Sequence, residues 1–322
     1  MIDKIKTSIR EDYDAYRKEF ENSVSSNVKI IDSVLSYIMK KKGKELRPIL
    51  CILSARLCGE PSKDTYLASS LLEIMHIATL VHDDIVDDAD KRRGWPTINR
   101  VWGNKLSLLI GDFMFSKSLI NMVKLQSSES LELLSMTAEN LSKGEILQIQ
   151  QSLKKDISEE GYLRMITDKT ASLFSASCKL GALSVTDSKE SHDALFSFGQ
   201  NLGIAFQMKD DLFDIYGDKK KLGKPVGYDL KKNMLTLPVI YALKDKGMVE
   251  RKVFVRTLKK YGRMNDLGNI KAVIADSGGI EYTEMMIERY TENAKNDIKS
   301  FPNSIYKDLM LEILNFNISR NI

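Results

Sequence analysis

Two aspartate clusters with the same internal spacing are the residues of this chain best suited to chemistry. Each follows the pattern D-D-x-x-D, and together they comprise Asp83, Asp84 and Asp87 in the first copy and Asp210, Asp211 and Asp214 in the second. Side chains three and four residues apart share one face of a helix, so each cluster places two or three carboxylates at one point. Carboxylates 4 Å apart repel by about 4 kcal/mol at an effective dielectric of 20. A divalent cation would remove this repulsion, so the pattern predicts a metal site.

Either cluster alone is equally well explained as the solvated acidic end of a helix. One D-D-x-x-D is expected by chance in roughly 7% of chains of this length. Two independent copies are much rarer, and the pair therefore favours a metal site.

The helix predicted over residues 63–90 has two faces. Its apolar face, suited to core packing, consists of Leu67, Leu71, Ile74, Ala78, Val81 and Ile85. The opposite face is apolar at its start and acidic at its end, in the order Leu72, Met75, His76, Thr79, Asp83, Val86 and Asp87. Such a gradient is typical of a helix that lines a deep pocket with metal at its mouth.

The helix predicted over 188–216 repeats this arrangement. One of its faces holds Gly199, Gly203, Phe206, Gln207, Asp210 and Asp214. A glycine inside a helix costs about 1 kcal/mol relative to alanine. The two glycines indicate either close packing against another helix or space beside the second carboxylate cluster.

Composition predicts an all-α protein. At this length one large helical domain is as plausible as two, and because no break in composition indicates two, we expect residues 1–322 to form a single domain. Only 6 prolines and 18 glycines interrupt the 322 residues, and alternating β-branched runs are scarce. The predicted helices span 1–22, 27–41, 48–58, 63–90, 104–124, 129–154, 159–185, 188–216 and 234–246, followed by shorter ones up to 316.

Charge and cysteine content exclude several classes of protein. The 48 basic and 44 acidic residues give a net charge of +4, too balanced to indicate a nucleic-acid partner. Cys51, Cys58 and Cys178 form no C-x-x-C pair and are expected to be reduced core residues. We find no signal sequence and no run approaching the ~20 apolar residues of a membrane span, so we expect a soluble, cytoplasmic protein without stable membrane insertion.

Several motifs together carry a resemblance to a known family. They are GKELRP (43–48), EIMHIATLVHDDIVDDADKRRGWPT (73–97), GEILQ (144–148), DKTASLF (168–174), FQMKDDLFD (206–214), GKPVGYDL (223–230) and TLP (236–238). In type and spacing these motifs closely resemble the trans-type isoprenyl diphosphate synthases, particularly the polyprenyl branch. The resemblance implies a single large bundle of antiparallel helices around a deep central cavity, the isoprenoid synthase type I fold.

The resemblance also implies the reaction and its ligands. An allylic diphosphate ionises and isopentenyl diphosphate attacks it, with about three Mg²⁺ ions in each substrate-bound site. Asp83, Asp84, Asp87, Asp210 and Asp214 would be metal ligands, and Asp211 and Lys169 would join them as catalytic residues. Isopentenyl diphosphate would be bound by Lys44, Arg47, His76 and Arg93, and the allylic diphosphate by Arg92, Lys169, Thr170, Gln207 and Lys224. A homodimer is implied as well.

One motif departs from the family pattern. DLKKNMLTLP (229–238) has Asn233 where glycine is usual and Met234 where lysine is frequent. Lys231 or Lys232 could take over the role of that lysine in phosphate binding.

Product length depends on the residues just before the first aspartate. In the family, bulky side chains four and five positions before it block the pocket, but this chain has Thr79 and Ala78 there. A helical turn rises about 5.4 Å, comparable to one isoprene unit, so the tail could reach Met75 and beyond. We expect a hexa-, hepta- or octaprenyl product suited to a quinone side chain, with Met122, Leu133 and Met136 as candidates for the pocket floor.

Four alternatives stay open from sequence alone. The nearest is a short-chain synthase that makes farnesyl or geranylgeranyl diphosphate. A terpene cyclase would usually have an Asn/Ser/Glu pattern in place of the second D-D-x-x-D, and a non-catalytic regulatory subunit would usually lack one aspartate motif. A calcium-binding helical scaffold would leave Lys44, Arg47, Arg92 and Arg93 unexplained.

Overall fold

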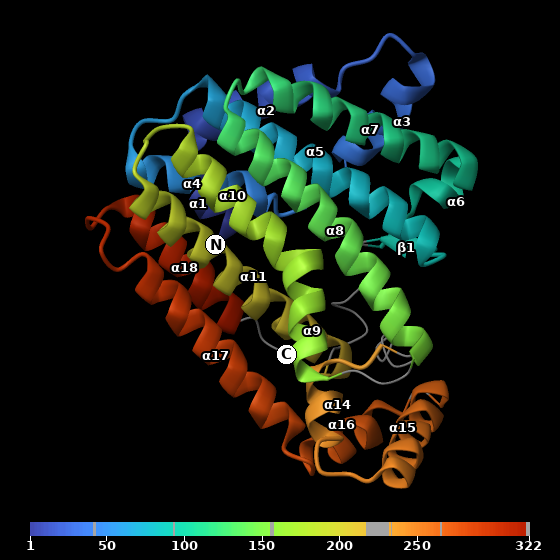
Figure 1. Cartoon of the computed structure of the whole chain (residues 1–322). Helices are drawn as coiled ribbons and strands as arrows, with labels where there is room; N and C mark the ends of the chain where they lie inside the picture. Colours follow the sequence, from blue (N-terminus) through green and yellow to red (C-terminus); the bar gives the residue numbers. More distant parts are fainter. Residues whose placement is uncertain are drawn as a thin grey trace.

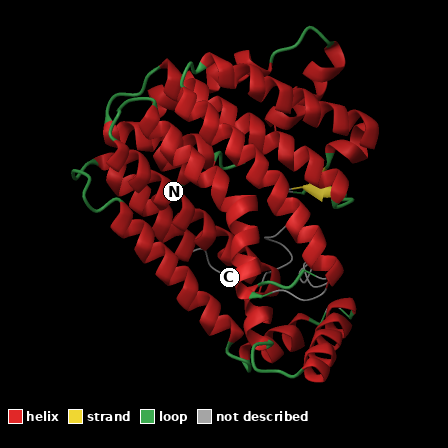
Figure 2. Ribbon diagram, in the orientation of Figure 1, coloured by secondary structure: helices red, strands yellow, loops and turns green. Residues whose placement is uncertain are grey.

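The computed structural model describes residues 1–40, 43–92, 94–154, 158–216, 232, 234–264 and 266–319. Helices account for most of these residues, which confirms the all-α prediction (Figure 2). The long helices α5, α8, α10, α11 and α17 run roughly along one direction, and α14, α15 and α16 gather at one end of the molecule (Figure 1).

Most neighbouring helices are joined by short connections, whereas residues 217–236 separate α11 from α14. In chain order they are α1 (Ile2–Ser8), α2 (Arg10–Val24), α3 (Lys29–Lys40), α4 (Leu46–Cys58), α5 (Lys63–Val86), α6 (Ile98–Trp102), α7 (Asn104–Lys124), α8 (Ser128–Lys154), α9 (Glu159–Ile166), the π-helix η1 (Thr167–Ala171), α10 (Ser172–Leu183), α11 (Lys189–Tyr216), α14 (Leu237–Ala242), α15 (Met248–Arg263), α16 (Leu267–Ala275), α17 (Gly279–Asp297) and α18 (Ile305–Ser319).

Four predicted helices differ from those observed. The helix expected over 234–246 is shorter and corresponds to α14 (Leu237–Ala242). The helix expected over 1–22 is two helices, because the backbone leaves helical geometry at Ile9. The helix expected over 63–90 begins at a capping box on Ser62 but ends at Val86, and Asp88 has a φ of 50°. A two-residue antiparallel ladder of β1 (Lys91–Arg92) and β2 (Trp95–Pro96) follows it. The helix expected over 159–185 is interrupted by η1.

Helix α11 is shared between two parts of the hydrophobic core. Its first half packs through Phe198 and Leu202 into a cluster built with α2, α4, α5 and α18. Its second half packs through Met208 and Leu212 into a cluster with α14, α16 and α17. A third cluster joins α4, α5, α8 and α10. The helix that carries the second aspartate motif is therefore fixed along its whole length.

The two glycines of α11 mark close helix packing. A Cβ on Gly199 would lie 2.5 Å from the carbonyl oxygen of Phe174, and one on Gly203 would lie 2.6 Å from the Cα of Ala171. Side chains do not approach backbone this closely, so only glycine lets α11 contact α10 and η1. Of the two explanations for these glycines, the close-packing one is correct.

Helix α7 is the one stretch of the described chain that is long and apolar enough to cross a membrane by length and composition. The expectation that no such run exists was wrong for this helix. Its most apolar window is 39% buried, and α7 packs along α5 within the bundle (Figure 1). His82 contributes to that packing, since its Nε2 lies 3.3 Å from both the Leu108 carbonyl and Asp112 Oδ1. One such helix is weak grounds for a membrane span.

Candidate active site

The first aspartate cluster lies at the carboxyl end of α5. Asp84 is buried, and Arg92 Nε donates a hydrogen bond to its Oδ1 at 2.9 Å, while Arg92 Nη2 lies 2.8 Å from the same oxygen in an ion pair. Asn99 donates to the backbone carbonyl of Asp84 at 3.4 Å. Asp84 thus ties the short hairpin to the end of α5 and fixes Arg92 beside the cluster.

Asp83 and Asp87 are half-buried and leave the same end of α5. Burial raises the pKa of Asp83 to about 7, and the negative charge of Glu145 on α8 adds to this rise. Lys169 and Arg92 act in the opposite direction on the same pKa. Charged residues of α5, α8 and η1 therefore all act on Asp83. An added cation there would be strongly favoured, because it would stabilise the ionised carboxylate.

The π-helix η1 positions Lys169 and Thr170. Lys169 forms an ion pair with Glu145, and its Nζ donates to Oε1 of Gln148 at 3.0 Å. Gly144 makes this possible, because a Cβ there would lie 2.4 Å from the backbone nitrogen of Lys169. Single π-helical turns inside α-helices are frequent at functional sites. Here the turn sets Lys169 against the GEILQ motif of α8.

The second cluster is organised by a hydrogen-bond chain around Asp211. Tyr162 donates to Asp211 Oδ2 at 2.6 Å, and Gln207 donates to Oδ1 at 2.8 Å. Thr170 in turn donates to Oε1 of Gln207 at 2.8 Å. Burial raises the pKa of Asp211 to about 7; the two hydrogen bonds counteract the rise and the charges of Asp210 and Asp214 add to it. Asp211 is held inward, whereas Asp210 and Asp214 stay half-buried.

The segment before α4 is held by a buried carboxylate. Glu45 has a φ of 55° and lies between Lys44 and Arg47 in the sequence. It accepts hydrogen bonds from Lys6 at 2.8 Å, Arg17 at 3.0 Å and Tyr16 at 3.3 Å, and one from Tyr13.

The ionisation of Glu45 reflects this setting. Burial alone would raise the pKa of Glu45, but hydrogen bonds from Lys6 and Tyr13 and the positive charges of Lys6 and Arg17 bring it below its usual value. Helices α1 and α2 therefore fix the backbone that carries Lys44 and Arg47.

Aromatic rings flank the two basic residues of this segment. Lys44 Nζ lies 4.9 Å from the ring centroid of Phe316 on α18. The Arg47 guanidinium lies 4.9 Å from the centroid of Phe174 on α10. Both contacts keep the cations oriented.

The residues expected to set product length fall into two environments. Ala78 is buried in the core cluster that includes Ile74 and Phe174. Thr79 is half-buried and donates to the His76 carbonyl at 2.9 Å. Met75 is buried with Leu72 in the cluster shared by α4, α5, α8 and α10. The apolar part of this face of α5, Leu72 and Met75, is filled by packed side chains.

The candidate floor residues separate in the same way. Met122 belongs to the cluster that contains Met75, and Leu133 packs against it. Met136 is 55% exposed. Met122 and Leu133 thus remain candidates for the floor, and Met136 is not placed with them.

Two of the predicted site residues, Arg93 and Lys224, lie outside the described residues, as do Lys231 and Asn233. Lys232 is described, and its Nζ donates to the backbone carbonyl of Asp87 at 3.2 Å. This contact places an ammonium group at the first aspartate cluster.

Sequence reasoning missed four residues that organise the site. Glu45 and Glu145 occur within quoted motifs but looked like ordinary acidic residues, and Gln148 was not assigned a role. Tyr162 gave no signal, because a tyrosine inside a predicted helix, here the one over 159–185, is common. Its partner, Asp211, is 49 residues away in the sequence.

The donor set at the two clusters fits Mg²⁺. Asp83, Asp87, Asp210 and Asp214 offer the carboxylate oxygens that this ion prefers. Within the described ranges, no three His, Cys, Asp or Glu side chains are gathered closely enough to hold a metal by themselves. Mg²⁺ is usually bound by one or two carboxylates together with water and substrate phosphates. The arrangement therefore suits ions that bind together with a diphosphate.

Comparisons with known proteins agree with this site. The family described as polyprenyl synthetase matches residues 28–276. Octaprenyl diphosphate synthase of Escherichia coli is 31% identical over 99% of both chains, and heptaprenyl diphosphate synthase component 2 of Geobacillus stearothermophilus is 33% identical over 95% of this chain and 94% of its own. A crystal structure of polyprenyl synthase from Caulobacter crescentus with calcium and isoprenyl diphosphate has a TM-score of 0.89 at 30% identity, covering 99% of this chain and 98% of its own. The chain belongs to the polyprenyl synthetase family of prenyltransferases.

Proposed function

We propose that this chain condenses isopentenyl diphosphate with an allylic diphosphate, in a Mg²⁺-dependent reaction, to make a long all-trans polyprenyl diphosphate. The observation that supports this most directly is the setting of Asp83. It lies at the end of α5 under the influence of Glu145, Lys169 and Arg92 at once. Carboxylates and fixed cations around one point are what a metal-bound diphosphate requires.

The proposed metal ligands are the half-buried carboxylates Asp83, Asp87, Asp210 and Asp214. When bound, Mg²⁺ would supply positive charge to the departing diphosphate. Asp84 would act by orienting Arg92, and Asp211 by keeping α11 and Gln207 in register with Thr170. The allylic diphosphate would be bound by Arg92, Lys169, Thr170, Gln207 and Lys224.

Isopentenyl diphosphate would bind on the opposite side of the reacting carbon. Its proposed ligands are Lys44, Arg47, His76 and Arg93. The allylic C–O bond breaks and both electrons leave with the diphosphate. The double bond of isopentenyl diphosphate then forms a bond to the allylic carbon, and the departed diphosphate accepts the proton whose loss creates the new double bond.

Incubation of the purified chain with Mg²⁺, labelled isopentenyl diphosphate and a set of allylic primers tests this function. We expect chain extension with a dominant product of roughly six to eight isoprene units, the length allowed when Thr79 leaves the next helical turn accessible. A dominant product of three or four units would contradict the long-chain assignment. No extension with any primer would contradict the function itself.

Thr79 provides a direct test of product length. We expect Thr79→Tyr to shorten the product without abolishing turnover, because the larger side chain would close the path toward Met75. Chain-length analysis by reversed-phase chromatography measures this. Thr79→Ser, which keeps a small hydroxyl side chain, is the control. Unchanged chain length in Thr79→Tyr would show that the tail does not pass Thr79.

We also propose a homodimer that forms through α7, with each chain a single domain active in the cytoplasm. The outer face of α7 is apolar and exposed at Leu108, Leu109, Phe115, Leu119, Ile120 and Val123. A largely apolar exposed face of this kind typically marks a protein interface.

Light scattering in solution tests the assembly. We expect twice the 36.5 kDa chain mass, and a monomer for Leu119→Glu. Ile305→Glu, an exposed apolar residue on α18, is the control and should stay dimeric. A native chain that is monomeric, and active only with a second polypeptide, would contradict the homodimer.

A further inference from the structure

Helix α15 concentrates the positive charge of the chain. Its 16 residues contain Arg251, Lys252, Arg256, Lys259, Lys260 and Arg263 but one acidic residue, Glu250. The helix thus has a net charge of +5, more than the +4 of the whole chain, and the other residues together are slightly acidic. Glu250 accepts a hydrogen bond from the Gly247 backbone at 2.8 Å, so its carboxylate lies at the start of the helix.

The inner and outer faces of α15 differ sharply. Leu258 and Phe254 pack into the cluster shared with α14, α16 and α17. Arg251 also turns back, donating to the Lys246 carbonyl at 3.0 Å. The outer face combines exposed cations, Lys252, Arg256 and Lys260, with large apolar side chains. These apolar side chains are Met248 (76% exposed), Val249 (75%), Val253 (56%) and Met264 (63%).

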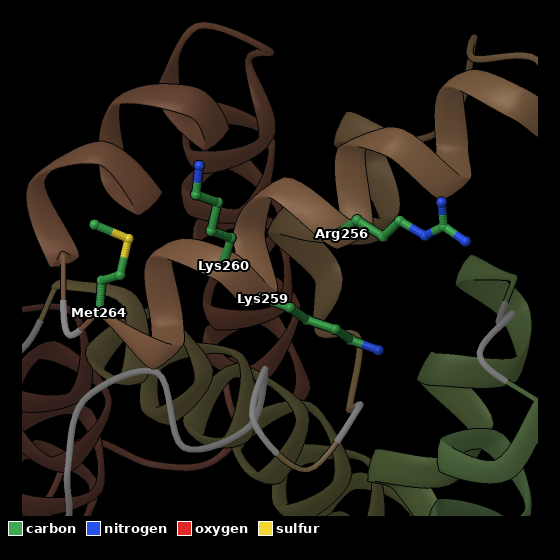
Figure 3. Close-up of a pocket in the computed structure, with 4 residues that line it drawn as sticks. All are labelled: Arg256, Lys259, Lys260 and Met264. Carbon is green, nitrogen blue, oxygen red and sulfur yellow. The ribbon is translucent and has the colours of Figure 1, made fainter.

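A hollow of about 460 Å³ lies along this helix, lined by Arg256, Lys259, Lys260 and Met264. Figure 3 shows the three basic side chains fanning out from α15. A concave site with several cations and an apolar side chain can accept a phosphate together with part of an acyl chain.

The mixture of side chains distinguishes this face from the one on α7. The exposed face of α7 is apolar with Asp112 among its outward residues, which suits a second protein copy. The face of α15 interleaves apolar residues with cations at helical spacing. Helices with such a face lie at the surface of anionic bilayers, where cations contact headgroups and apolar side chains enter the acyl boundary.

We propose that α15 docks this protein onto the surface of membranes that contain anionic phospholipids, with headgroup phosphates beside the separate cations of its outer face. The biological purpose rests on the proposed function, since a long prenyl chain partitions into a bilayer and docking would bring the enzyme to the place where its product is taken up. The binding itself does not depend on catalysis.

Vesicle sedimentation of the full chain, without substrate, tests the proposal. We expect binding to phosphatidylcholine vesicles that contain phosphatidylglycerol, weakened by salt, and little binding to phosphatidylcholine alone. Each cation near an anionic surface strengthens binding roughly fivefold, so the triple variant Lys252→Gln, Arg256→Gln, Lys260→Gln should bind roughly a hundredfold more weakly. The variant Val253→Ser, Met264→Ser keeps every charge and should also bind several-fold more weakly.

A matched control removes the same charge elsewhere. Lys18→Gln, Lys63→Gln, Lys189→Gln takes three exposed lysines from α2, α5 and α11 and should bind vesicles like the native chain. Equal losses in both triple variants, or no binding by the native chain, would overturn the proposal. Vesicle binding by Val253→Ser, Met264→Ser at the native level would also overturn the proposal, because it would show that the apolar side chains take no part and that α15 binds by charge alone.

Prenyl transfer measured separately in detergent should be the same in all variants. A chain that binds vesicles but never extends a primer would refute the proposed function and leave the docking surface intact.

Discussion

Replacing Asp83 or Asp210 with alanine should lower turnover by on the order of a thousandfold or more, because the metal-supported departure of diphosphate loses an anchoring carboxylate. Steady-state assays with saturating Mg²⁺ and both diphosphates measure this loss. Asp88→Asn is the control, since Asp88 adjoins the cluster but points to Arg100, with 2.9 Å between Oδ1 and Nη2. Asparagine also tolerates the φ of 50° at that position. Similar losses in Asp83→Ala and Asp88→Asn would contradict the assignment of the first cluster.

Asp83→Ala should lose turnover without losing thermal stability in the metal-free fold. The pKa of Asp83 is raised to about 7 by burial and by Glu145, so the folded state disfavours the charged carboxylate. For an acid with a raised pKa, the metal-free fold loses stability as pH increases from the unfolded-state value toward 7. Asp83→Ala removes that contribution. Thermal unfolding in chelator should therefore show an unchanged or higher midpoint at pH 8, and a strongly lowered midpoint would point to a structural role instead.

Glu45→Gln should destabilise the fold by about 3 kcal/mol, because it leaves Lys6 and Arg17 without their buried carboxylate. It should also raise KM for isopentenyl diphosphate, since the segment that carries Lys44 and Arg47 loses its anchor. Urea unfolding and steady-state kinetics measure the two effects.

The matched control is Glu21→Gln, which removes the exposed partner of Arg17 on the same helix and should change stability little. Glu45 has a lowered pKa, so its contribution is complete above its unfolded-state pKa and is lost as pH falls through the lower folded-state pKa. A Glu45→Gln variant as stable as Glu21→Gln would show that α1 and α2 do not anchor the segment through this carboxylate.

Helix periodicity predicted the face of α5 that runs from Leu72 to Asp87, because that face depends only on residues three and four positions apart. The same reasoning could not detect η1. A π-helical turn depends on how closely α8 approaches through Gly144, a contact between segments distant in sequence. The glycines of α11 illustrate the same limit. Only the positions of Phe174 and Ala171 in the fold show that these glycines allow close helix packing and do not leave open space beside the second cluster.

Ionic anchors were the least predictable part of the site. Arg92 was expected to bind phosphate, and the structure adds its hydrogen bond and ion pair to Asp84, only eight residues away. Tyr162 and Asp211 are brought together by the packing of α9 on α11, and Glu45 meets Arg17 only after α2 folds against α4. Residue type and spacing identified the groups that could react, whereas tertiary packing determined which of their neighbours hold them.

The position of Lys44 has a consequence for how the protein matures during translation. Its backbone is held by the first two helices through Glu45, but its side chain rests on Phe316 in the last described helix, which the ribosome makes after all the others. The contact between Lys44 and Phe316 therefore cannot form until α18 has been synthesised and has docked. Nascent chains that stall before α18 should carry both aspartate clusters yet lack the aromatic ring beside Lys44.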